Sequence, residues 1–155
     1  MRRKDKEITE KTIIDSILNE SEICRLGLVE NGEAYIVPVN FAHSNGALYI
    51  HSAVQGRKIE VLKRNNKVAF EMEAHASIKT GSKPCDWTAR YRSAMGKGII
   101  EIETDLAQKK LGLDLIMKKY GWGSEELIYD APLLSRVCIL KVIIESVSAK
   151  QSGDW

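Results

Sequence analysis

The sequence contains few of the features that mark secreted, membrane or metal-binding proteins. Its three cysteines, Cys24, Cys85 and Cys138, lie far apart and never form CxxC, which argues against a disulfide framework or a cysteine zinc site. The apolar runs are too short to span a bilayer, and residues 1–7 are charged, unlike a secretory signal. The three histidines show no metal-ligand spacing. We therefore expect a cytoplasmic protein with reduced thiols, no membrane association and no metal.

The sequence also lacks the common nucleotide-binding and hydrolase motifs. It contains no GxGxxG after a predicted strand, no GxxxxGK[ST] and no GxSxG, which argues against Rossmann, P-loop and α/β-hydrolase enzymes. The formal net charge is only +2, so bulk electrostatics do not favour nucleic acid. The basic tripeptide at residues 90–92 is weak evidence by itself, and we expect no nucleic-acid partner.

Length and composition indicate one globular domain over residues 1–155. Hydrophobic residues make up 44% of the chain and charged residues 28%, as in ordinary folded proteins. A chain of 155 residues can bury one sizeable core but not two large ones.

Two Asn-Gly steps organise the first half of the sequence. Asn31-Gly32 and Asn45-Gly46 each lie between alternating polar and apolar runs, which is the pattern of tight β-hairpins. The runs 23–29, 33–42 and 47–52 therefore predict a three-stranded antiparallel meander.

The rest of the chain predicts a mainly β protein. Residues 74–86 lose all periodicity and predict a long loop, while the residues from Ala149 onward predict a frayed tail. Six strands and about three helices favour an antiparallel β-barrel with covering helices, because closure protects the strand edges. The remaining predicted elements are strands over 67–73, 87–103 and 135–147 and helices over 10–20, 56–64 and 105–120.

The segment from Ala47 to Arg64 combines a strand, a glycine and two adjacent cations. The strand leads through Gly56 to Arg57 and Lys58 in the first turn of a predicted helix. Free N–H groups and the positive end of the helix dipole favour an anion there, and the cations add charge-assisted hydrogen bonds. The segment predicts a phosphate site, with a solvated helix end and ordinary surface cations as the alternative.

Two other predicted strands are interrupted. Pro38 has no N–H, so it marks an edge, a bulge or the end of strand pairing, and it leaves backbone that can face a planar ligand. Gly96 and Gly98 indicate a bulge or the close approach of a ligand or another backbone.

Four segments, in this order and at these spacings, carry a family resemblance: MRRKDKEI, YIVPVNF, ALYIHSAVQGRKI and PCDWTARYRSAMGKG. Together they resemble the nitroimidazole-resistance branch of the pyridoxamine 5'-phosphate oxidase-like flavoproteins. The similarity covers residues 1–103 well and the rest by general layout.

This resemblance implies a six-stranded split β-barrel homodimer that binds FMN non-covalently at the subunit interface, with FAD or haem as alternative cofactors. Arg57 and Lys58, preceded by Gly56, would hold the FMN phosphate. The other residues implied to lie beside the cofactor, the last three from either subunit, are Pro38, Val39, Asn40, Phe41, His51, Ser52, Tyr91, Arg92 and Ser93.

The resemblance also implies an FMN-dependent reductase whose small-molecule electron acceptor is a planar electrophile such as a nitroaromatic. His51 and Arg92 would be catalytic, because both can donate hydrogen bonds to negative charge on flavin or substrate. A structural histidine on a strand face is the alternative for His51. His75 and Cys85 could approach the site from the predicted loop. A flavin or haem carrier, or a redox sensor without turnover, is the alternative function.

Overall fold

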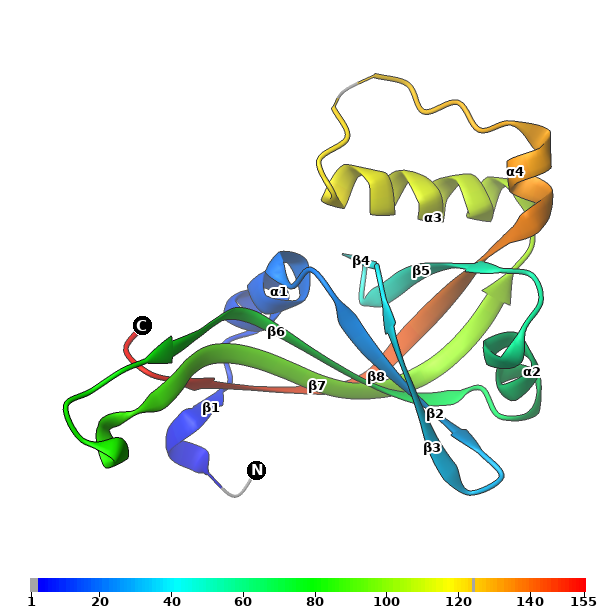
Figure 1. Cartoon of the computed structure of the whole chain (residues 1–155). Helices are drawn as coiled ribbons and strands as arrows, with labels where there is room; N and C mark the ends of the chain where they lie inside the picture. The colour runs from blue at the N-terminus through cyan, green and yellow to red at the C-terminus, as the bar shows by residue number, and fades with distance from the viewer. Residues whose placement is uncertain (1–2, 124) are drawn as a thin grey trace.

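The computed structural model describes residues 3–123 and 125–155. Residues 1 and 2 of the first resemblance segment and Ser124 lie outside the described residues. Figure 1 shows the elements, which in chain order are η1 (a 3₁₀ helix, Lys4–Lys6), β1 (Glu7–Ile8), α1 (Lys11–Glu20), β2 (Cys24–Glu30), β3 (Glu33–Val39), β4 (Ala42–Ser44), β5 (Ala47–Ala53), α2 (Arg57–Arg64), β6 (Lys67–Lys79), η2 (Pro84–Asp86), β7 (Thr88–Glu103), α3 (Leu106–Lys119), α4 (Ala131–Arg136) and β8 (Val137–Ser152).

The strands form one antiparallel sheet. Its order is β3-β2-β6-β7-β8-β5-β4, and the short strand β1 also pairs with β8. Strands β7 and β8, each 16 residues long, run through the molecule and connect its two halves (Figure 1). The prediction of a mainly β antiparallel protein with three covering helices is confirmed. The sheet has eight strands rather than six, because the short strands β1 and β4 were not predicted.

Both predicted Asn-Gly hairpins are present. Asn31 and Gly32 connect β2 to β3, and Asn45 and Gly46 connect β4 to β5. All four residues have positive φ, from 49° at Asn45 to 84° at Gly32, as a two-residue hairpin of type I′ requires.

The predicted meander is wrong, because the two hairpins do not pair with each other. Strand β3 is one edge of the sheet, whereas β5 pairs with β8 and β4 forms the opposite edge. The predicted strand 33–42 is broken at Asn40 and Phe41. Pro38 lies on edge strand β3, opposite Arg25, where its missing N–H costs little pairing.

Residues 74–79 of the predicted loop 74–86 belong to a strand, and residues 84–86 form η2. Strand β6 continues to Lys79 and pairs with β7, so the two strands form a long hairpin (Figure 1). We call the outer part of this hairpin, residues 73–93, the arm. The register shifts between Ala74 and Ser77, and His75 within the shift has φ 56°. This bulge breaks the alternation of polar and apolar residues, which explains why the sequence pattern disappears there.

The C-terminal residues are also more ordered than predicted. Strand β8 runs to Ser152, and its last residues pair with β7 and with β1. The predicted frayed tail from Ala149 is therefore wrong. Neighbouring strands on both sides supply hydrogen bonds that the local sequence does not reveal.

The main core lies between the sheet and helices α1 and α2. Ile17 of α1 and Val61 of α2 are buried in it. Helix α3 packs on the other face of β5 and β8, where Gly112 allows Ile139 to approach closely. Among the described residues, no helix is long and apolar enough to cross a membrane.

The two glycines of β7 are required by close contacts with the neighbouring strands β6 and β8. A Cβ at Gly96 would lie 2.2 Å from the ring of Phe70, and one at Gly98 would lie 2.1 Å from the carbonyl oxygen of Ile143. The register with β8 also shifts between Lys97 and Gly98. The predicted bulge is confirmed, and the close partners are backbone and core side chains of the same chain.

Candidate functional site

Strand β5 leads into α2 through a glycine with left-handed backbone. Gly56 is the N-cap of α2 and has φ 119°, and no side chain of the described residues caps the helix there. The N–H of Glu60 donates to the carbonyl of Gly56. The N–H groups of Arg57, Lys58 and Ile59 therefore have no acceptor within the helix, and they present the positive end of its dipole.

Lys58 and His51 lie close together at this helix start. Lys58 is half-buried, and among the described residues its ammonium makes no ion pair. Burial lowers the pKa of Lys58. Burial and the nearby charge of Lys58 lower the pKa of His51, so this histidine is largely neutral at pH 7. The adjacent Ser52 is buried. An anion would compensate this incompletely solvated positive charge.

Arg57, the second predicted phosphate ligand, is already paired. Its Nε donates to Glu30 Oε2 at 2.8 Å, and its guanidinium lies 4.1 Å from the centre of the Tyr35 ring. Glu30, which comes from the β2–β3 hairpin, could not be identified from a sequence motif. Because the Arg57 side chain is largely exposed, this ion pair is weak and a phosphate could replace the carboxylate.

The contact of Arg57 with Tyr35 connects the helix start to the predicted ring-binding stretch. Val39 lies four positions beyond Tyr35 on β3, a path of about 13 Å along the strand. The α2 start, through Arg57 and Tyr35, is thus connected along β3 to Val39.

The end of β3 is held by the last turn of α3. Phe41 is fully buried, and its N–H donates to the hydroxyl of Tyr120 at 3.2 Å. That hydroxyl donates in turn to the carbonyl of Glu22 at 2.5 Å. The ammonium of Lys119 lies 3.3 Å from the centre of the Phe41 ring. Sequence reasoning did not identify Lys119 or Tyr120, whose contacts depend on how α3 packs.

The third predicted group lies on the arm. Arg92 Nε donates to Gln151 Oε1 at 3.2 Å, and its guanidinium lies 4.2 Å from the Trp155 ring. Ser93 is 4% exposed, and its buried hydroxyl has no hydrogen-bond partner among the described residues. Tyr91 is half-buried, near Lys150. One chain does not bring these residues to the α2 start, which lies at the other half of β8.

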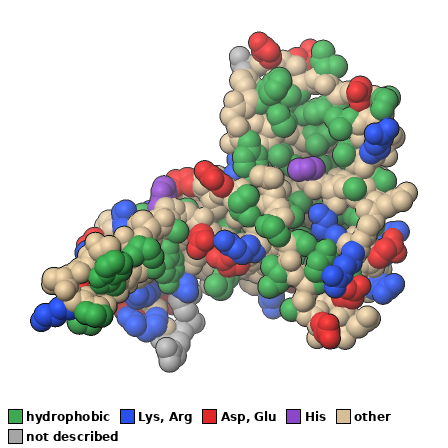
Figure 2. Space-filling view, viewed as in Figure 1, with side chains coloured by type: hydrophobic (Ala, Val, Ile, Leu, Met, Phe, Trp, Pro, Cys, Tyr) green, Lys and Arg blue, Asp and Glu red, His purple; other side chains and the backbone are tan. Residues whose placement is uncertain are grey.

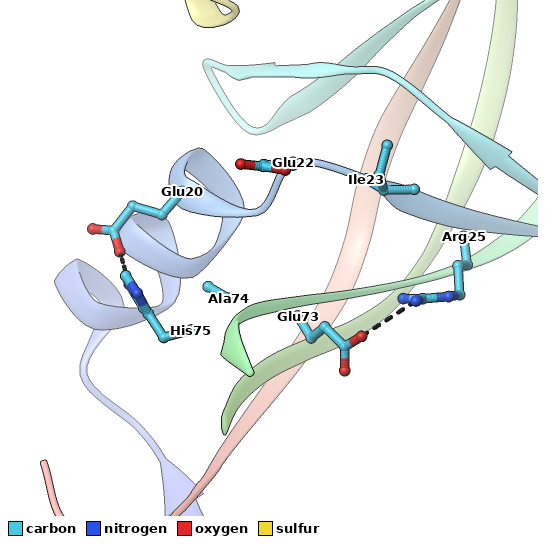
Figure 3. A pocket seen from close by; sticks show the side chains of 7 residues that line it. All are labelled: Glu20, Glu22, Ile23, Arg25, Glu73, Ala74 and His75. Carbon is cyan, nitrogen blue, oxygen red and sulfur yellow. Dashed lines mark hydrogen bonds and ion pairs between the residues drawn. The ribbon is translucent and has the colours of Figure 1, made fainter. Parts of the chain in front are cut away.

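His75 and Cys85 do not approach the α2 start. Figure 3 shows His75 at the root of the arm, where its ring contacts the carboxylate of Glu20 at 2.5 Å. This pair borders a pocket of about 390 Å³, whose other side carries the ion pair of Arg25 with Glu73. Ser16 and His75 lower the pKa of Glu20. Cys85 is exposed near the far end of the arm.

The face of the sheet opposite α1 carries exposed apolar side chains. Ile36 is 63% exposed and Met95 47% exposed, and both border a largely apolar hollow of about 400 Å³ with Gly27 and Ala69. Further hydrophobic side chains gather on the arm and around the α3–α4 end (Figure 2). The arm and the sheet face therefore offer apolar surface that no described element of the chain covers.

A protein-family model described as pyridoxamine 5'-phosphate oxidase matches residues 10–151. A proposed 5-nitroimidazole antibiotic resistance protein from Bacteroides thetaiotaomicron has 32% identity and a TM-score of 0.82, covering 94% of this chain and 86% of that one. An FAD- and haem-binding protein from Mycobacterium smegmatis has 23% identity and a TM-score of 0.84, covering 97% and 75%. The latter likeness concerns the fold alone.

One curated relative, an uncharacterised protein from Rhizobium meliloti, is 33% identical over 76 residues. The match spans 49% of this chain and 49% of that relative, so this chain covers about half of its length.

Proposed function

This chain belongs to the pyridoxamine 5'-phosphate oxidase family and has its split-barrel fold, and from this premise we propose that it is an FMN-dependent reductase of small planar electrophiles such as nitroaromatics. Its 32% identity with a proposed 5-nitroimidazole resistance protein supports this substrate class. The free cysteines are compatible with the cytoplasm, where we place the protein.

The observation that carries the proposal is the half-buried ammonium of Lys58 at the uncapped start of α2. It has no ion-pair partner among the described residues, and the first turn of the helix, which carries Lys58, has free N–H groups. The FMN phosphate fits this set of donors, because its oxygens accept from backbone N–H groups, from Lys58 and from Arg57. Arg57 would exchange Glu30 for the phosphate.

The end of β3 would hold the flavin ring. Strand pairing stops after Val39, which leaves the backbone of Asn40 free to face a planar group, while Phe41 is fixed by Tyr120. When bound, reduced FMN supplies the electrons for the reaction. Neutral His51 can donate one N–H to negative charge on the flavin or the acceptor without adding a full charge of its own.

We propose that the protein acts as a homodimer with its cofactor at the interface. Tyr91, Arg92 and Ser93 can join the α2 start only from a second copy, since their own chain places them on the arm. The exposed apolar sheet face around Ile36 and Met95 offers contact surface for that copy.

The absorbance spectrum of the purified protein tests the cofactor. Flavin bands, or their appearance when FMN is added, support the proposal, whereas a Soret band would replace it with the haem alternative. Protein that remains colourless with added FMN would refute both assignments.

Substitution of the cations tests the site. The double variant R57A/K58A should bind FMN at least tenfold more weakly, because charge-assisted hydrogen bonds contribute about 1.5–3 kcal/mol each. K63A is the matched control, since Lys63 lies on the same helix but is paired with Glu60. Equal FMN affinity of the folded double variant and K63A would place the phosphate elsewhere.

A further inference from the structure

A pocket of about 700 Å³ lies between the end of α1 and the end of α3, beside the break after β3. Asn40, the residue at that break, lines it together with Lys119 and Tyr120 of α3 and with Glu20 and Glu22. The pocket therefore directly adjoins the backbone that would face the flavin ring.

Lys119 is the cation of this pocket, and its charge is only partly satisfied. Nζ donates to the carbonyl of Leu18 at a long 3.4 Å and lies over the Phe41 ring, but it makes no ion pair among the residues that the structure describes. An ammonium has three N–H donors, so hydrogen-bonding capacity remains for a ligand. Burial lowers the pKa of Lys119 to about 8, and the ammonium is mostly protonated at pH 7.

The carboxylates of the pocket do not neutralise this ammonium. Glu20 is turned to His75 at the root of the arm (Figure 3). Glu22 makes no ion pair within 4.0 Å among the described residues. The Asn40 side chain likewise has no hydrogen bond there, so its amide is a second donor at the pocket wall.

From this arrangement we propose that the pocket binds the electron acceptor, and that Lys119 holds the paired oxygens of its nitro or carboxylate group. The role as acceptor site rests on the proposed function, whereas oxyanion binding by Lys119 does not. A planar group with two partially negative oxygens matches an ammonium and an amide that line the same pocket, and this pocket adjoins the Asn40 backbone that would face the flavin. Lys119 thus fixes the orientation in which the acceptor binds.

Binding of two simple probes to the protein, with and without FMN, tests the proposal by ligand-observed NMR. Nitrobenzene carries the oxygen pair in a nitro group and benzoate carries it in a carboxylate, so the two probes show which of these groups the pocket prefers. K119M should weaken binding of the preferred probe at least tenfold, and K119R, which keeps the charge, should restore it to within about threefold. K118M is the matched control, because Lys118 is exposed on the same helix and lies outside the pocket.

Raising the pH from 7 to 9.5 should weaken probe binding in the wild type and leave K119R unchanged. The titratable groups around the ammonium that bear on this profile are Cys24, His43, Tyr120, Glu20 and Glu22. None of them is altered in K119R.

Equal binding of the preferred probe by wild type and K119M, or an equal loss in K118M, would overturn the proposal. FMN affinity, measured in each variant, separates this result from failure of the proposed function. K119M that binds FMN normally but loses the probe supports both proposals. If the wild type binds the probes through Lys119 but never binds FMN, oxyanion binding by Lys119 is supported and the proposed reductase function is refuted.

Discussion

His51 and Arg92 are connected through opposite halves of the same strand. His51 pairs with Ile139 of β8, and Arg92 is opposite Gln151, twelve positions further along. At about 3.3 Å per residue this is a path of about 40 Å. The two residues that the family resemblance makes catalytic therefore cannot meet on one cofactor unless two chains contribute.

Mixed dimers test this arrangement directly. A dimer of one K58A chain and one R92A chain, isolated through two affinity tags, should retain about half of the wild-type nitroaromatic reduction, because one of its two sites is intact. A dimer of one wild-type chain with one K58A/R92A chain should be inactive, because each site then lacks one residue. Sites built within one chain would give the reverse pattern of activities.

Glu30 should compete with the FMN phosphate for Arg57. E30Q removes the carboxylate and should tighten FMN binding by up to about fivefold, because an exposed ion pair contributes about 0–1 kcal/mol. FMN fluorescence quenching measures the affinity. E33Q is the matched control on the same hairpin, since Glu33 makes no ion pair among the described residues. Weaker binding by E30Q would show that Glu30 supports the site instead.

The protein should lose stability in mild acid through His43 and His51. Burial lowers the pKa of both histidines below 6.5 in the folded protein. At a pH between the folded and unfolded pKa values, the unfolded chain therefore binds more protons than the folded one. The free energy of unfolding should therefore fall as the pH drops from 7 through the region below 6.5. Urea titrations at pH 7.5 and 5.5 measure the fall, which should be smaller in H43N/H51N. An unchanged fall in that variant would assign it to other groups.

Gly98 should tolerate no side chain. G98A would place a methyl group 2.1 Å from a backbone oxygen, so we expect it to lower the free energy of unfolding by about 1–3 kcal/mol or more. G27A is the matched strand control, because a Cβ there meets its nearest atom at an ordinary 3.5 Å. Chemical denaturation compares the variants, and equal stability of the two would mean that β8 moves away freely.

Local sequence was sufficient for features whose cause is local. The positive φ values needed at Asn31 and Gly32 are those that Asn-Gly adopts readily, so both hairpins could be predicted. The start of α3 was equally readable, because Asp105 caps it by accepting from the N–H of Gln108. Gly56 and the two cations after it likewise marked the α2 start as a candidate anion site.

The pairing of strands that lie far apart in the sequence could not be predicted in the same way. An antiparallel meander and two separate hairpins have the same alternation, and only the pairing of β5 with β8, whose residues follow much later in the chain, separates them. The arm was not predicted, because the bulge at His75 moves every later side chain of β6 to the opposite face of the sheet.

The candidate site likewise has one part that the local sequence predicts and another part that depends on long-range packing. The sequence by itself determined which residues carry the needed chemistry: Arg57 and Lys58 at a helix start, and an interrupted strand at Pro38. Only the tertiary structure decided that Arg57 is held by Glu30, that Lys58 has no ion-pair partner among the described residues, and that Arg92 lies far from both. The physical reason is that charge compensation depends on which side chains are neighbours in space, and the sequence alone does not reveal these neighbours.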